Sequence, residues 1–173
     1  MPDGGRSAII REENRQPITS IAFSSDGRWL LTGTNHGFIQ IRSLDQLDGP
    51  PILSRQISSE PVYAISCSPD RRRIIAGCRG GQSLLVDFES GEIIAALDGH
   101  DGPIRSAIFS VEGSVVVTAG QDGKIGLWRT TDGNPLLMLR AHNCPIHQIA
   151  ISHHGQMIAS ASEDGCVKLW KIV

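Results

Sequence analysis

The sequence predicts an all-β fold built from repeated antiparallel sheets, and three observations support this prediction. The 173 residues include 19 glycines and nine prolines spread along the chain, which is typical of many turns and short elements. Short runs rich in isoleucine, valine and leucine lie between these turns, as expected for strands joined by hairpins. Four segments also align with one another without a gap, at a spacing of about 42 residues.

The four aligned segments each begin at a proline. They read "PITSIAFSSDGRWLLTGTNHGFIQIR" from Pro17, "PVYAISCSPDRRRIIAGCRGGQSLLV" from Pro61, "PIRSAIFSVEGSVVVTAGQDGKIGLW" from Pro103, and "PIHQIAISHHGQMIASASEDGCVKLW" from Pro145. Each opens with a strand whose apolar residues step by three and then by two, so one extra bulged residue is predicted. The predicted bulges fall near Thr19, Tyr63, Arg105 and His147.

A first turn follows in each segment, at "SSDG", "SPDR", "SVEG" or "SHHG", and leads into a second strand such as "WLLTG". The second turn is "NHG", "RGG", "QDG" or "EDG", with glycine where a positive φ is needed. A third strand then runs to Ile41, Leu85, Leu127 or Leu169, and a fourth run such as "IIAALDGH" leads into the next segment. Four short antiparallel strands per repeat of about 42 residues indicate the blades of a β-propeller.

We expect a single domain over residues 1–173, with repeats at about 14–57, 58–99, 100–141 and 142–173 and an N-terminal strand at 7–13. The segment "SAIIREE", from Ser7 to Glu13, precedes Pro17 as "EIIAALDGH" precedes Pro103. The chain therefore begins with a fourth strand and ends at a third strand. We expect Ala8 to Arg11 to pair beside Val167 to Trp170, within one chain or between two, so that the termini share the closing blade.

The last two repeats resemble units of the WD-repeat family. The resemblance is carried by "DGHDGPIRSAIFSVEGSVVVTAGQDGKIGLW" and "RAHNCPIHQIAISHHGQMIASASEDGCVKLW". It implies a hydrogen-bonded chain in each blade that connects a histidine, a hydroxyl, an aspartate and a tryptophan. These residues are His100, Thr118, Asp122 and Trp128 in the third repeat, and His142, Ser160, Asp164 and Trp170 in the fourth. Repeats one and two depart from the pattern, with Asn14 and Ser58, His36 and Gly80, and Arg42 and Val86 at the histidine, aspartate and tryptophan positions.

Two chemical roles are alternatives to this structural role. A histidine, a hydroxyl and an aspartate also suggest a catalytic triad, but the set recurs in two repeats with its hydroxyl inside a strand, whereas a nucleophile needs one exposed cleft. His142, Cys144 and His147 in "HNCPIH", with His153 and His154, suggest zinc. Because His142 belongs to the blade and the histidine pair lies in a distant turn, we expect no metal. The predicted protein is neither an enzyme nor dependent on a cofactor.

Binding remains as the predicted function. The resemblance implies that the loops before the first strand and after the second gather on one face, where the family docks peptides and protein domains. We expect a non-enzymatic interaction scaffold; the alternative is a structural or regulatory portion of a larger multidomain protein. The candidate binding residues differ in charge and shape from repeat to repeat. They are Thr19, Tyr63, Arg105 and His147, together with Asn35, Arg79, Gln121 and Glu163.

The net charge of −2 predicts no broad attraction to nucleic acid or to an anionic membrane. Without a signal sequence or an apolar span of about 20 residues, a cytoplasmic protein is expected. Propellers of this family more often have about seven blades, and sometimes about eight, so three arrangements compete for four repeats. They are a four-blade ring, a homodimer that completes an eight-blade ring, and an open arc that is part of a longer propeller. We favour a closed assembly, and the two-chain form slightly over the monomeric ring.

Overall fold

The computed structural model describes residues 9–10, 16–47 and 49–172, and within them the chain forms four antiparallel sheets. The first sheet contains β1 (Ile18–Phe23), β2 (Trp29–Thr34), β3 (Phe38–Ser43) and β4 (Leu53–Gln56), with a 3₁₀ turn at Leu44–Gln46. The second contains β5 (Val62–Cys67), β6 (Arg73–Cys78), β7 (Ser83–Asp87) and β8 (Ile93–Leu97). The third contains β9 (Ile104–Phe109), β10 (Val115–Gly120), β11 (Lys124–Arg129) and β12 (Pro135–Arg140). The fourth contains β13 (Ile146–Ile151), β14 (Met157–Ser162) and β15 (Val167–Lys171).

Each sheet is a meander in which consecutive strands pair as hairpins. The first pair of every sheet skips one residue in its register, and the skipped residues are Thr19, Tyr63, Arg105 and His147. The predicted bulges are therefore confirmed. The second turn of every sheet contains a glycine with positive φ, as the turn motifs predicted. In the first turn of the second sheet, Arg71 adopts φ 58° where the other sheets have glycine.

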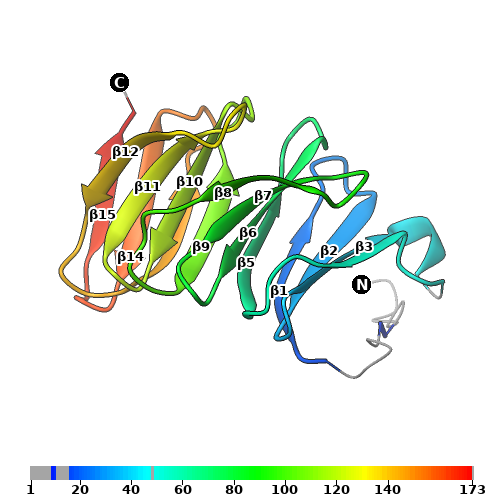
Figure 1. Ribbon diagram of the computed structural model, residues 1–173. Coiled ribbons are helices and arrows are strands. Elements are labelled where there is room, and N and C mark those ends of the chain that lie inside the picture. Colours follow the sequence, from blue (N-terminus) through cyan, green and yellow to red (C-terminus); the bar gives the residue numbers. More distant parts are fainter. Residues whose placement is uncertain (1–8, 11–15, 48, 173) are drawn as a thin grey trace, which may run out of the picture.

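The sheets stand side by side along an arc, and the core lies between them (Figure 1). Strands β1, β5, β9 and β13 line the inner edge of the arc, and each is adjacent to the next. Aliphatic residues from facing sheets form three successive buried clusters. Since a sheet of this kind buries both faces only when it has a neighbour on each side, each end sheet has one face that no other sheet covers among the described residues.

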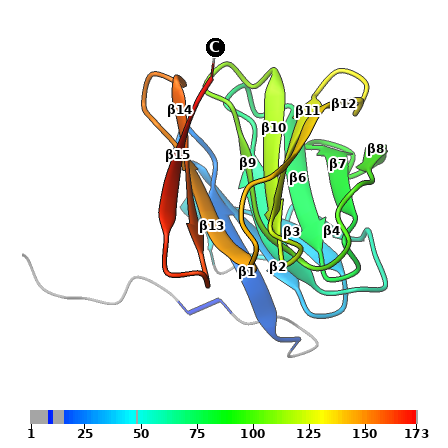
Figure 2. The same cartoon turned by 90° about the vertical axis from the view of Figure 1, so that its left-hand side faces the viewer.

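The arc is open within one chain. Figures 1 and 2 show β1–β4 at one end and β13–β15 at the other, so the four-blade ring considered from the sequence is not formed. Among the described residues, β15 has β14 as its one neighbouring strand. Ile9 and Ile10 belong to no strand, and Ala8 and Arg11 lie outside the described residues. The expected pairing of this segment with β15 therefore stays a prediction.

Candidate binding face and end groove

A chain of hydrogen bonds connects the turn and the strands of the third sheet. His100 Nδ1 lies 3.0 Å from Asp122 Oδ1, and His100 Nε2 lies 2.8 Å from Thr118 Oγ1. The indole Nε1 of Trp128 donates to the same hydroxyl at 2.8 Å. The indole can only donate, so the hydroxyl accepts from it, and the Asp122 carboxylate can only accept, so His100 Nδ1 carries a proton and donates to it. Each of the four side chains is thus hydrogen-bonded within the chain.

Asp122 is ionised in this network. Its burial opposes ionisation, but hydrogen bonds from the backbone N–H of Asp101, from His100 and from the backbone N–H of Lys124 outweigh it. These donors hold the pKa of the Asp122 carboxyl below its ordinary value. The Thr118 hydroxyl is completely buried inside the ladder. It has no access to a substrate, and the arrangement is that of a clamp between strands.

The fourth sheet repeats this chain with a serine. His142 Nδ1 lies 2.7 Å from Asp164 Oδ2, and His142 Nε2 lies 2.8 Å from Ser160 Oγ. Trp170 Nε1 donates to Ser160 Oγ at 3.0 Å. The hydrogen bond from His142 is the main cause that lowers the pKa of the Asp164 carboxyl. Trp170 is only half-buried, in contrast to the fully buried Trp128, because no outer strand covers β15 among the described residues.

The first sheet is held by different side chains. Arg42 occupies the tryptophan position and is buried, and its guanidinium donates to the carbonyl of Gly49 at 2.8 Å and to Gln40 Oε1 at 3.3 Å. The side-chain oxygen of Thr32, at the hydroxyl position, has no hydrogen-bond partner among the described residues. The histidine position of the first sheet is Asn14, which lies outside the described residues. In the second sheet Val86 fills the tryptophan position and is fully buried.

The candidate binding residues lie at one end of the strands, where each second turn meets the start of its own sheet. The backbone N–H of each turn residue donates to the carbonyl of the proline that opens the same segment. The distances are 2.9 Å for Asn35, Arg79 and Gln121, and 3.0 Å for Glu163. Since the bulge is two residues after that proline, turn and bulge residues are neighbours in every blade.

Two contacts join candidate residues of this face. The Arg105 guanidinium carbon lies 5.3 Å from the centre of the Tyr63 ring, which joins the second and third sheets. His147 Nε2 lies 3.4 Å from Glu163 Oε1 within the fourth sheet. Arg105, His147 and Glu163 are exposed, and Tyr63 is half-buried. The Arg105–Tyr63 pair offers a cation and an aromatic surface to a ligand from one spot.

Thr19 differs from the other bulge residues. Its hydroxyl lies within hydrogen-bond distance of the carbonyl oxygens of Gly33, at 3.1 Å, and Val62, at 2.6 Å. The side chain therefore joins the first sheet to the second. The sequence pattern marked the position of Thr19 but not this occupied hydroxyl, because the acceptor Val62 belongs to the next repeat.

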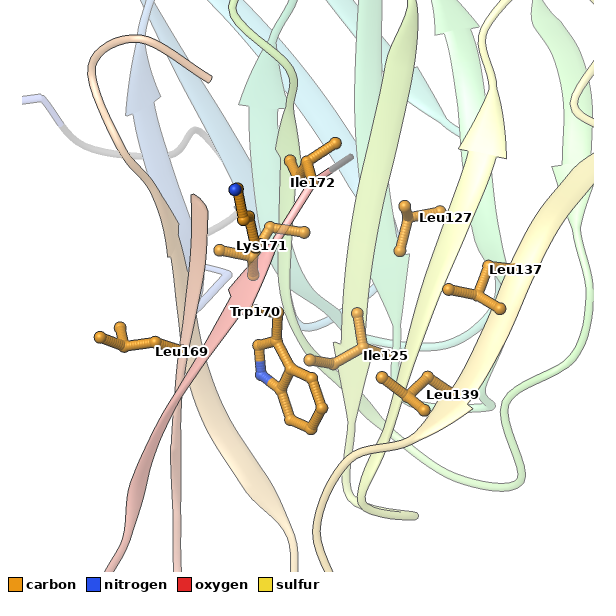
Figure 3. A pocket seen from close by; sticks show the side chains of 9 residues that line it. Ile125, Leu127, Leu137, Leu139, Leu169, Trp170, Lys171 and Ile172 are labelled. Atoms are coloured by element: carbon orange, nitrogen blue, oxygen red, sulfur yellow. The ribbon is translucent and has the colours of Figure 1, made fainter. Parts of the chain in front are cut away.

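An apolar groove that sequence reasoning did not locate lies at the end of the arc. It has a volume of about 390 Å³ and is lined by side chains of β11, β12, β14 and β15. Figure 3 shows Trp170 from β15 pointing toward Ile125 and Leu139. Leu137 on β12 is also half exposed along this groove. The groove occupies the space that an outer strand fills in the other three sheets.

The described residues, 9–10, 16–47 and 49–172, hold no group of three or more histidine, cysteine, aspartate or glutamate side chains arranged to bind a metal ion. All four cysteines are free thiols. Burial raises the pKa of the Cys67 thiol to about 11. No helix in the described part of the chain has the length and apolar character needed to cross a membrane.

Repeated four-stranded meanders, inter-sheet cores and the histidine-to-tryptophan clamp define a repeat protein made of propeller blades. The family model for the WD domain, G-beta repeat, matches residues 7–43, 91–129 and 133–171. The chain therefore belongs to the WD-repeat family. The matched segments omit most of the second repeat, in which Ser58, Gly80 and Val86 replace the histidine, aspartate and tryptophan.

Relatives and a solved structure agree with this family. A WD repeat-containing protein of Schistosoma mansoni is 33% identical over 116 residues, which are 66% of this chain and 37% of that protein. A serine-threonine kinase receptor-associated protein of Dictyostelium discoideum is 30% identical over 115 residues, 66% of this chain and 38% of that protein. The chain thus spans less than two thirds of either relative. The crystal structure of the computationally designed Ika4 protein matches 98% of this chain and 99% of its own with a TM-score of 0.83, and its 23% identity shows the fold alone.

Proposed function

We propose that this chain is a non-enzymatic interaction scaffold that binds a peptide or a protein domain on the face formed by its bulge and turn residues. The contrast between two sets of positions carries the proposal. Clamp positions in the last two sheets hold the same kinds of side chain, with the same distance of 2.8 Å from the histidine to the hydroxyl. The face positions vary in charge and shape from blade to blade, as expected for a surface that recognises a partner.

The strongest anchor on this face is the Arg105–Tyr63 pair. Arginine and tyrosine are the types that most often dominate binding energy at interfaces. The cation is held 5.3 Å from the ring centre and carries no carboxylate partner among the described ion pairs, all of which join other residues. A ligand that contacts both side chains meets a positive charge and a flat apolar surface together. We place the binding of the partner to this face in the cytoplasm, the compartment expected from the sequence.

Affinity capture with the whole chain as bait tests this function. Tyr63→Ala/Arg105→Ala should lose at least one partner that the wild-type chain retains, because both anchors of the face are removed. The matched control is Arg28→Ala/His154→Ala, which removes a similar pair from exposed turns at the opposite end of the strands. Undiminished capture of every partner by the Tyr63/Arg105 variant would refute the proposed face.

A second role has its own supporting observation. The chain spans 37% and 38% of the two relatives described above, so the blades also suit a structural or regulatory portion of a larger multidomain protein. In that case the face docks another part of the same polypeptide. Capture of an isolated neighbouring domain by the wild-type face, and not by the Tyr63→Ala/Arg105→Ala variant, would separate this role from binding of a separate partner.

A further inference from the structure

The same packing pair recurs at every junction between neighbouring sheets. A small residue at the end of the second strand receives the branched residue that opens the next sheet. A Cβ added at Gly33 would lie 2.7 Å from Val62 Cγ1, and one added at Gly77 would collide with Ile104. At the third junction Ala119 and Ile146 are both fully buried in one cluster. Close packing of this kind specifies which faces fit together.

Each end of the arc has one residue of this packing pair without its partner: the small residue at one end, and the branched residue at the other. Ala161 is the small residue of the fourth sheet, and no following sheet covers it among the described residues. Ile18 opens the first sheet and is 41% exposed, whereas Val62, Ile104 and Ile146 at the same position are 0% exposed. The two ends are therefore complementary in the way that the internal junctions are.

The outer edge of the fourth sheet is also incomplete. β15 has no partner strand on its outer side among the described residues, and Leu169 on β15 is 65% exposed, whereas Leu85 at the corresponding position of β7 is buried in the cluster between the second and third sheets. In the complete sheets this position pairs with a fourth-strand residue, as Ile41↔Leu53, Leu85↔Ala95 and Leu127↔Leu137. Each partner lies eight residues before the proline that opens the next segment. Counted in the same way from Pro17, the residue that fits opposite Leu169 is Ile9.

We propose that a second copy of this chain docks head to tail on the first. Ile18 of one copy packs on Ala161 of the other, and a strand through Ile9 pairs with β15 and fills the apolar groove. A twofold axis repeats the junction, so the faces at both ends are covered and eight blades close into a ring. The two ends of one arc lie apart in Figure 1, which is why the occupant is a second copy. The proposal is independent of the ligand bound by the face.

A disulfide trap tests the junction directly. At the equivalent internal junction, a Cβ added at Gly33 lies 2.9 Å from the Cβ of Val62, which a small shift brings into disulfide range. Ile18→Cys/Ala161→Cys in a Cys166→Ser background should give, after mild oxidation, a non-reducing band at twice the chain mass of 18.6 kDa. Either single-cysteine variant should stay at the chain mass. A monomeric intramolecular product, a ladder of larger species or no disulfide would each overturn the proposal.

Light scattering at about 10 µM, well above the nanomolar range of stable dimers, provides the second measurement. The wild type should have twice the mass of the chain, and Ala161→Arg should reduce it to 18.6 kDa with an unchanged far-UV circular dichroism spectrum. The control Ile94→Arg places the same charge on an exposed outer-strand residue of the second sheet and should leave the dimer intact. A wild-type mass of 18.6 kDa, or a dimer unaffected by Ala161→Arg, would overturn the proposal.

Discussion

Replacing Thr118 with valine should reveal how much the clamp stabilises its blade. Valine keeps the shape of threonine and removes only the hydroxyl, which is hydrogen-bonded to His100 and Trp128 at 2.8 Å each. Both partners are buried, so each ring nitrogen loses the one hydrogen-bond partner that it has among the described residues. A buried polar group left unpaired costs about 1–3 kcal/mol. For two such groups we expect the free energy of unfolding to fall by about 3 kcal/mol.

Urea denaturation followed by tryptophan fluorescence and circular dichroism measures this loss, at one fixed protein concentration because association shifts apparent stability. The midpoint should fall with little change in the m-value. Thr118→Ser is the matched control, since Ser160 fills the same role in the fourth sheet. It keeps the hydroxyl and should lose only about 1 kcal/mol for its missing methyl group. A valine variant as stable as the serine variant would refute the reasoning.

Three further outcomes follow from the structure. Deleting residues 1–12 should lower the melting temperature clearly, because this deletion removes the predicted closing strand. Deleting residues 1–6 leaves that strand in place and should not lower the melting temperature. Equal melting temperatures for the two variants would count against the strand. Since the folded-state pKa of Asp122 is lowered, the unfolded state binds more protons in acid, so stability should fall as the pH drops below the ordinary carboxyl range. Asp122→Asn should flatten this dependence, and a parallel pH profile would contradict it. At pH 8, iodoacetamide should label exposed Cys166 well before Cys67, whose thiol pKa is raised to about 11 by burial; equal rates by mass spectrometry would argue against that burial.

The local architecture was predictable from the chain alone because its causes lie within about 26 neighbouring residues. The steps of three and two placed the bulge at Tyr63, and glycine in the second turn marked a positive φ at Gly123. Each of these depends on strand periodicity or turn chemistry, which act over one hairpin.

Other features of the site depend on contacts between repeats and were not visible in the sequence. The Thr19 hydroxyl is occupied by a carbonyl of the next sheet, and Arg105 meets Tyr63 across a junction. In the sequence, Arg42 is a departure from the pattern at the tryptophan position. In the structure its long side chain is buried and donates to the carbonyl of Gly49. Side chains that reach across sheets respond to the relative placement of whole blades, which no single repeat encodes.

By itself the sequence determined four β-meanders, their bulges and turns, and the residues of the blade clamp. Only the tertiary structure decided that the four sheets form an open arc, that no further sheet covers Ile18 or Ala161 among the described residues, and that an apolar groove runs beside β15. The reason is physical. Strand pairing is specified by local alternation and hydrogen bonding, whereas the relative placement of successive sheets is set by the packing of side chains across each junction.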